Sequence, residues 1–349
     1  MQFTRLPEAT QTLYAELLDQ VIQAEAEAVA RRLPPKGSFV SKKIKGQVYW
    51  YLQRLEAGRK AQYYLGVDSP QLQHWMKSST AAREERRGDD LRRAELVAML
   101  IAGGVARPDA ATGRVLRTLC EIGVFRLGGV LVGPQAFICY ANLLGVKFDS
   151  GSLRTQDIDV AQDPTVVVGI DPSVVPSDMG TALSEADPGF FAVPALDRGK
   201  PSTSFKVRGR DVRVDLLTPA RGESREPVLL RHLNAAAQPL SFLDYLLEGY
   251  QAAAVPATSG LLVNIPEPAR FAWHKLWTAG ERPSTEHVKS NKDVRQAGQL
   301  FEVLEQDRPG DLERAWGSVE HPAHQEQMAL SASKLSDQAA KVARRIIHG

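Results

Sequence analysis

An uncharged run of twenty residues, Leu127 to Val146, restricts the fold of this chain more than any other segment. Its length matches the roughly 20 residues that an α-helix needs to cross the ~30 Å apolar core of a bilayer. The run also contains turn-forming and polar residues: Gly128, Gly129, Gly133, Pro134, Gln135 and Asn142. Because glycine and proline interrupt helices, we expect a buried strand, a tight turn at Gly133 and a helix from Gln135 to Leu144 instead of a membrane span.

The composition is that of an ordinary globular protein. The chain has 349 residues, of which 43% are hydrophobic and 24% are charged, which excludes wholesale disorder, collagen and coiled coils. A chain of this length is expected to form two or three domains. The two cysteines, Cys120 and Cys139, lie in apolar stretches, and the first eight residues contain no apolar signal region. We therefore expect two unpaired thiols, a cytoplasmic location and no membrane partner.

Charge is distributed unevenly, although the formal net charge is only +2. From Arg31 to Arg93 the chain has 15 Lys or Arg and 6 Asp or Glu, a local net charge of +9 that leaves −7 for the remainder. Seven aromatic residues lie in the same segment. Interleaved basic and aromatic residues are typical of nucleic-acid-binding surfaces, where cations meet phosphates and rings stack on bases. A small sheet with a solvated basic face is the alternative interpretation.

Residue patterns in the N-terminal third predict a helix, a small sheet and two further helices. Strong helix formers from Leu13 to Leu33 precede Pro34 and Pro35 and predict the first helix. Short runs separated by glycine predict an antiparallel β-meander of three strands: Ser38–Lys45, Gln47–Arg54 and Lys60–Leu65. The next two helices are expected at Leu91–Ile101 and Ala110–Ile122, with the mixed-charge stretch Arg83–Arg93 as a polar linker or helix end.

The rest of the chain predicts a mixed α+β centre followed by a helical C-terminal region. Strands are expected at Gln156–Val160, Thr165–Ile170, Phe190–Val193, Ser204–Val207, Asp211–Leu217 and Leu261–Ile265. After Pro266, helices are expected at Pro268–Ala279, Lys292–Leu304, Gly310–Ser318 and Gln325–Ile347. We therefore divide the chain into a basic N-terminal region (1–110), a central core (111–265) and a C-terminal helical region (266–349).

Two aspartates separated by one residue mark the main candidate site. Asp157 and Asp159 share one face of a predicted strand with Cα atoms about 6.6 Å apart, while Ile158 points to the other face. Carboxylates this close repel each other, and a divalent cation neutralises them. Asp215 is a further lone aspartate in an apolar strand, and on an adjacent strand it completes a cluster able to hold two Mg²⁺ ions about 3.5 to 4 Å apart. The alternative is that the aspartates simply face solvent.

The order of these elements resembles the nucleotidyltransferase superfamily of DNA polymerase β. An apolar strand ending in Gly133, a helix, the sequence Arg154-Thr155-Gln156-Asp157-Ile158-Asp159 and a later strand with Asp215 carry the resemblance. The likeness is greatest to the minimal and AbiEii-like nucleotidyltransferases of prokaryotes. Trp273-His274-Lys275-Leu276 and Lys292-Asp293-Val294 resemble later family elements, so the resemblance extends from Val124 to Leu304.

The resemblance implies both a fold and a reaction. The fold is α+β, a mixed β-sheet core flanked by helices, preceded by the helix and β-meander and followed by the helical region. The reaction is in-line transfer of a nucleoside monophosphate from an NTP, with two Mg²⁺ ions, or Mn²⁺ in their place. Asp157, Asp159 and Asp215 are the implied catalytic metal ligands. The implied nucleotide-binding residues are Gly133, Arg154, Thr155 and Lys275.

The acceptor and the partners remain open at the level of sequence. The resemblance implies RNA such as tRNA, or a protein hydroxyl, and by analogy a toxin role with an antitoxin partner. Pro134 departs from the family pattern because it removes a backbone N–H that could bind phosphate. This departure favours the alternative of a catalytically inactive, nucleotidyltransferase-like protein that binds nucleic acid. Lys292 and Asp293 are interpreted as a structural charge pair.

Overall fold

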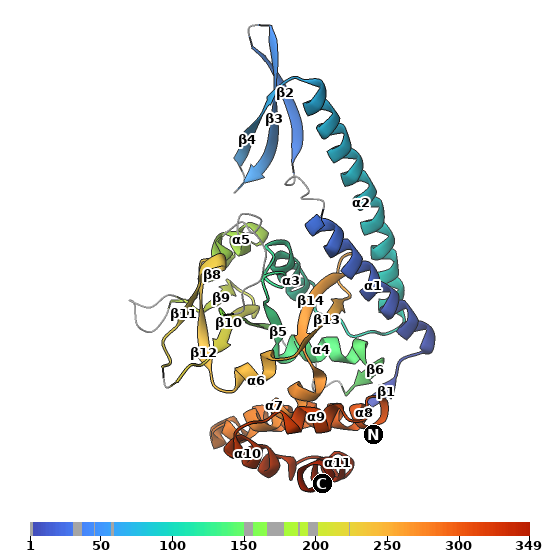
Figure 1. Cartoon of the computed structure of the whole chain (residues 1–349), viewed down its shortest axis with the longest axis vertical. Coiled ribbons are helices and arrows are strands. Elements are labelled where there is room, and N and C mark those ends of the chain that lie inside the picture. The colour runs from blue at the N-terminus through green and yellow to red at the C-terminus, as the bar shows by residue number, and fades with distance from the viewer. Residues whose placement is uncertain are drawn as a thin grey trace.

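The computed structural model describes residues 3–30, 37–44, 46–56, 59–149, 156–165, 178–187, 189–194, 202–222 and 224–349. The molecule is elongated (Figure 1). A three-stranded sheet lies at one end, and two long helices connect it to a central region of helices and strands, which we call the centre. A group of helices lies at the other end. The predicted α+β class is confirmed.

A mixed sheet at the centre has the strand order β11-β12-β10-β7-β5. These strands are β5 Val130–Val132, β7 Asp157–Ala161, β10 Arg213–Pro219, β11 Val228–Leu230 and β12 Ala235–Leu240. β10 is parallel to both β7 and β12, whereas β5 and β11 are antiparallel to their neighbours. β9 (Ser204–Val207) pairs antiparallel with the start of β10 and with β8 (Phe190–Ala192). The sheet thus brings together strands that lie between residues 130 and 240 of the chain.

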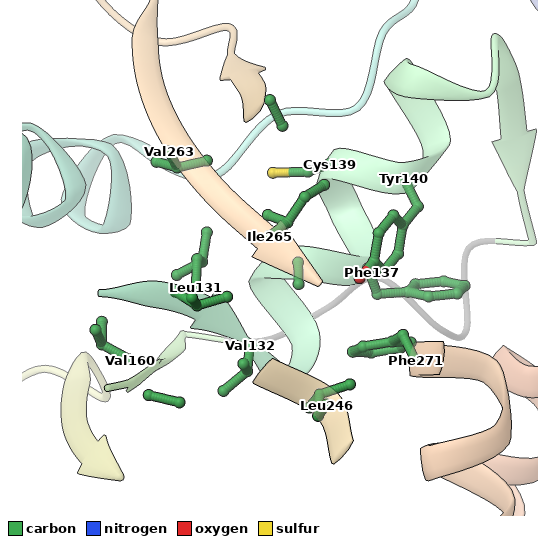
Figure 2. Close-up of a cluster of buried hydrophobic side chains, with 14 of the residues drawn as sticks. Leu131, Val132, Phe137, Cys139, Tyr140, Val160, Leu246, Val263, Ile265 and Phe271 are labelled. Carbon is green, nitrogen blue, oxygen red and sulfur yellow. The ribbon is translucent and has the colours of Figure 1, made fainter. Parts of the chain in front are cut away.

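The uncharged run folds as the predicted strand, turn and helix, in which β5 leads directly into α4 (Gly133–Leu143). Phe137 and Tyr140 are fully buried, and Figure 2 shows them close to Phe271. The Tyr140 hydroxyl donates a hydrogen bond to the Pro266 carbonyl at 2.8 Å. The run is therefore apolar because it forms the core. Of the helices in the described ranges, none combines the length and the apolar character that crossing a bilayer requires.

The N-terminal helix packs directly on the centre. α1 (Glu8–Ala30) lies against the hairpin of β13 (Tyr250–Val255) and β14 (Leu261–Pro266). Leu17 is fully buried, and the Tyr14 hydroxyl donates to the Ala254 carbonyl at 3.0 Å. Just before α1, β1 (Phe3–Arg5) pairs with β6 (Val146–Phe148), the strand that follows α4. The sequence patterns did not predict β12 or β13, because both are rich in alanine, a residue depleted in strands.

The predicted β-meander is confirmed. β2 (Ser38–Ile44), β3 (Gln47–Glu56) and β4 (Arg59–Val67) form an antiparallel sheet in the order β2-β3-β4. Figure 1 shows this sheet beyond the centre, at the end of α2 (Pro70–Ala102). We call β2 to β4 the meander below.

The prediction of a linker or helix end at Arg83–Arg93 was wrong, because this stretch lies within α2. Ser69 caps the helix by accepting from the Leu72 N–H at 3.2 Å, and Pro70 occupies the first turn, where its missing N–H costs nothing. The mixed charges form ion pairs three residues apart, Arg92 with Asp89 and Arg93 with Asp90. The charged residues of this stretch thus belong to a helix of 33 residues, in which Arg93 is buried and Arg92 is exposed.

The chain is helical after Pro266, as predicted. The helices are α7 Pro268–Glu281, α8 His287–Asp307, α9 Asp311–Gly317, α10 Pro322–Ala332 and α11 Asp337–His348. The single helix predicted at Gln325–Ile347 is in fact two, α10 and α11. Trp273 is fully buried, with its ring 4.7 Å from that of Phe301.

Among the described residues, the centre also contains the short helices α3 Ala110–Glu121, α5 Met179–Ala186 and α6 Leu243–Leu247. The strand predicted at Thr165–Ile170 lies outside the described residues beyond Thr165. Both cysteines are free thiols, as expected, with Cys139 buried and Cys120 partly buried.

Candidate active site

The register of two parallel strands brings the candidate aspartates together. β7 and β10 pair so that Asp159 lies opposite Asp215 and Asp157 lies opposite Arg213. Neighbouring strands are about 4.8 Å apart, so the two central carboxylates leave adjacent backbones on the same face. Ile158 is fully buried on the other face, while Asp157 is exposed and Asp159 is partly buried.

The environment of Asp159 favours its protonated form. Burial, followed by the negative charges of Asp215 and Asp157, raises the pKa of Asp159 to about 7, against the opposing charges of Lys275 and Arg213. A carboxyl group that is partly desolvated beside two others is costly to ionise. Positive charge placed at this point therefore stabilises the ionised cluster.

Gly133 approaches Asp159 more closely than any other residue type could. Val132 pairs with Asp159 across the β5–β7 ladder, and the chain turns at Gly133 with a φ of +61°. A methyl group on Gly133 would collide with Oδ2 of Asp159 and lie 3.1 Å from its Cγ. The glycine predicted from the strand–turn–helix pattern therefore has two roles, since it adopts the left-handed conformation and leaves room for the carboxylate.

A cationic group from the C-terminal helices faces the aspartates. Lys275 of α7 is mostly buried and donates to Asp293 Oδ1 at 2.7 Å, while Arg282 Nε donates to Asp293 Oδ2 at 2.6 Å. The charge of Lys275 acts on Asp159, and that of Asp157 acts on Lys292, so both lysines lie within electrostatic reach of the strand pair. Burial and the neighbouring Lys275 lower the pKa of Lys292.

The structure changes the interpretation of Lys292 and Asp293. Asp293, with only 4% of its side chain exposed, binds Lys275 and Arg282 and so orients the lysine. Lys292 is the next residue along α8, and its charge interacts with that of Asp157. Asp293 is therefore the structural member of this pair, and Lys292 is a candidate substrate contact.

Sequence reasoning also missed two residues around Asp215. Arg213 Nε donates to Asp215 Oδ1 at 2.7 Å, the Ser204 hydroxyl donates to the same oxygen, and an Arg213 Nη donates to Ser204 Oγ at 3.0 Å. Arg213 precedes Asp215 by two residues, so the period of two along a strand already placed it on the same face. Ser204 could not be found this way, because only the β9–β10 pairing brings it there.

The donor set fits a hard divalent cation. Asp157, Asp159 and Asp215 offer carboxylate oxygens, the ligands that Mg²⁺ prefers, and the raised pKa of Asp159 marks a position that gains from a cation. Among the described residues, no three His, Cys, Asp or Glu side chains are already arranged to hold a metal ion. The Asp215 carboxylate is held by Arg213 and Ser204. Arg154 and Thr155, the other predicted nucleotide contacts, lie outside the described residues.

Comparison with protein families tests the resemblance seen in the sequence. A family model described as nucleotidyltransferase matches residues 110–320, which is more than half of the chain. The chain belongs to the nucleotidyltransferase family. The matched span contains Gly133, the three aspartates, Lys275 and Lys292, so the candidate site of this nucleotidyltransferase lies entirely within it.

The N-terminal part of this nucleotidyltransferase matches a different family. A model described as a domain of unknown function (DUF6788) matches residues 5–74, a span that holds α1 and the meander. No curated protein matches the chain. The placement among AbiEii-like nucleotidyltransferases thus stays a prediction.

Replacing Gly133 with alanine is expected to lower both stability and nucleotidyl transfer. The left-handed conformation costs a non-glycine residue roughly 1–2 kcal/mol, and the new methyl group must also displace the Asp159 carboxylate. We expect at least a tenfold loss of transfer. Gly222→Ala is the matched control, because Gly222 has a φ of +64° and no atom within 4 Å of an added Cβ. Equal transfer by the two variants would contradict the role of Gly133; thermal melts and transfer assays measure both effects.

Proposed function

We propose that this nucleotidyltransferase moves a nucleoside monophosphate from an NTP to an acceptor hydroxyl in a Mg²⁺-dependent reaction. The observation that carries the proposal is the register of β7 and β10, which sets Asp159 beside Asp215 within reach of Lys275. Asp157, Asp159 and Asp215 are the proposed metal ligands. Two bound Mg²⁺ ions, or Mn²⁺ in their place, would neutralise the charge that develops on the α-phosphate and on the leaving pyrophosphate.

Basic residues near the aspartates are proposed to bind the triphosphate and to position a metal ligand. Lys275 and Lys292 bind the triphosphate, because two partly buried ammonium groups beside the carboxylates supply the fixed positive charge that phosphoryl transfer requires. Asp293 keeps Lys275 in one orientation through a 2.7 Å contact. Arg213 positions the Asp215 carboxylate.

The turn between β5 and α4 is proposed to contact the triphosphate as well, from the side opposite the two lysines. Helix N-termini present free N–H groups to anions. Pro134 supplies no N–H, but it occupies the first turn of α4, where proline is well tolerated. The remaining N–H groups of this turn, including that of Gly133, are the proposed donors.

A second candidate is an inactive relative that binds nucleic acid. It is favoured by the engagement of Asp215 with Arg213 and Ser204, together with Pro134. The toxin role and the antitoxin partner are supported only by the resemblance to AbiEii-like proteins, and a shared fold is a weak argument for biological role.

Transfer of labelled nucleotide separates the two candidates. The protein is incubated with each of four α-³²P-labelled NTPs, Mg²⁺ and either total RNA or total protein. We expect one acceptor class to become labelled, no labelling from γ-³²P-NTP, and no labelling without the metal. The variant Asp157→Asn/Asp159→Asn should fold and transfer nothing. Equal labelling by that variant, or transfer of the γ-phosphate alone, would refute the proposed reaction.

A further inference from the structure

The meander has two faces with different surroundings. On one face the Phe39 ring lies 5.6 Å from that of Trp75 in α2, and the guanidinium of Arg83 lies 5.0 Å from the centre of the Phe39 ring. Leu52, opposite Phe39 on the neighbouring strand, is buried. This face is therefore the small core between the meander and α2.

The opposite face carries a cluster of tyrosines. The β3–β4 pairing sets Tyr51 opposite Tyr64, and the rings of Tyr49 and Tyr51 lie 6.3 Å and 5.6 Å from that of Tyr64. Lys42 is opposite Tyr49 and places its ammonium group 4.8 Å from the Tyr51 ring centre. Tyr64 is 57% exposed. We call Lys42, Tyr49, Tyr51 and Tyr64 the tyrosine face.

The charge of the meander complements a polyanion. Between residues 38 and 67 the sequence contains six Lys or Arg and a single Glu. The ammonium groups of Lys42, Lys43 and Lys60 are on exposed side chains. Aromatic rings interleaved with cations suit nucleic acid, because rings stack on bases and cations neutralise phosphates. A duplex hides the faces of its bases, so a stacking surface requires a single strand.

The position of the tyrosine face indicates a large ligand. α2 has 33 residues and is therefore about 50 Å long, and the meander lies at its N-terminal end, beyond the centre (Figure 1). A molecule that contacts both the meander and the candidate active site must be extended. RNA meets this requirement and presents single-stranded loops and ends with unstacked bases, which are the usual targets of RNA recognition.

We propose that the tyrosine face binds a single-stranded segment of an RNA acceptor. The proposal rests on the proposed nucleotidyl transfer, whose acceptor class it names. Tyr51 and Tyr64 stack on successive bases, and Lys42 contacts the phosphates between them. The meander thereby holds the RNA while the acceptor hydroxyl reaches the aspartates.

Binding of RNA to the full-length protein tests the proposal without requiring catalysis. Fluorescence anisotropy with a labelled single-stranded oligoribonucleotide of mixed sequence reports the Kd. We expect Tyr51→Ala/Tyr64→Ala to raise the Kd by at least about 20-fold, because stacking contributes a factor of roughly 5 to 150 per base. Tyr51→Phe/Tyr64→Phe retains the rings and should bind within about twofold of the wild type. Lys42→Gln should reduce the slope of log Kd against log salt by about 0.7.

A matched control and several outcomes make the test decisive. Tyr250 is 50% exposed and lies outside the meander, so Tyr250→Ala should leave RNA binding unchanged. Undetectable RNA binding, wild-type binding by the double alanine variant, or tighter binding of the equivalent DNA strand would overturn the proposal. Circular dichroism establishes that each variant is folded.

The two proposals can fail separately. Nucleotidyl transfer and RNA binding are measured in separate assays, and the aspartates and the tyrosine face belong to different sheets. Nucleotidyl transfer to protein alone, with no RNA binding, would refute the tyrosine-face proposal and leave the reaction intact. RNA binding that depends on the tyrosines, without any transfer, would refute the reaction and the acceptor role of the RNA, and would leave only the contact between the RNA and the tyrosine face.

Discussion

Asp159→Asn is expected to abolish nucleotidyl transfer and at the same time to stabilise the protein at pH 8. The carboxylate is a proposed metal ligand, so its loss removes the reaction. Its ionisation is also costly, since burial and the nearby charge of Asp215 raise the pKa of Asp159 to about 7. Asparagine has the same shape and carries no charge, so the cost disappears. Opposite effects on activity and stability are characteristic of a functional site that is strained by its own charges.

The free energy of unfolding depends on pH because the pKa of Asp159 is higher in the folded protein than in the unfolded chain. Below about pH 4 the carboxyl is protonated in both the folded and the unfolded protein. As the pH rises from about 4 to 7, the unfolded chain loses this proton while the folded protein keeps it, so the free energy of unfolding falls. Above pH 7 the loss is complete and amounts to about 4 kcal/mol, since each pKa unit corresponds to about 1.4 kcal/mol. The stability advantage of Asp159→Asn should therefore develop between pH 4 and 7.

Thermal unfolding at pH 5 and pH 8 in the presence of EDTA measures this effect. The melting temperature of the variant should exceed that of the wild type by several degrees at pH 8 and by less at pH 5. Asp178→Asn is the control of opposite sign. Asp178 caps α5 by accepting from the Thr181 N–H at 2.7 Å, which lowers the pKa of Asp178. Its replacement should not stabilise the protein at pH 8, and a stabilised Asp178→Asn variant would contradict the argument.

Asp293→Ala is expected to cause the largest loss of stability, about 3 kcal/mol in the free energy of unfolding. Asp293 is almost completely buried and accepts from both Lys275 and Arg282. Removing it leaves two positive charges near each other without their shared counter-ion. The freed Lys275 also loses its orientation, so the KM for NTP should rise. Chemical denaturation and steady-state kinetics measure these two effects.

The pH dependence of the unfolding free energy, and a control variant at an exposed ion pair, show whether the buried ion pairs of Asp293 cause the loss of stability. Hydrogen bonds and the charges of Lys275 and Arg282 outweigh burial and lower the pKa of Asp293. The stability that Asp293 contributes is therefore present above about pH 4 and is lost as the pH falls through its lowered folded-state pKa. Asp311→Ala removes the partner of the exposed Arg314 and should cost at most about 1 kcal/mol. A similar loss of stability for both variants at pH 7 would contradict the claim that the buried ion pairs of Asp293 contribute more than an exposed ion pair.

Local sequence patterns were most informative where a glycine or proline interrupts a helix or strand. The glycines and Pro134 within the uncharged run predicted β5, the turn and α4, because these residues limit backbone conformation independently of context. The three meander strands were predicted by their glycine boundaries. The pattern was misleading at Arg83–Arg93. Its mixed charges are typical of a linker, but the stretch belongs to a long helix that Ser69 caps and in which Pro70 occupies the first turn. They were also uninformative for the alanine-rich β12 and β13.

Within the candidate site, sequence and tertiary structure determined different things. The alternation of side chains along a strand already determined that Asp157 and Asp159 share a face, because this follows from backbone geometry alone. Only the tertiary structure decided that Asp159 lies beside Asp215, that Ser204 binds Asp215, and that Asp293 orients Lys275. These contacts join residues 11 to 56 positions apart. Local periodicity cannot specify register, since the packing of the whole core selects which strands become neighbours.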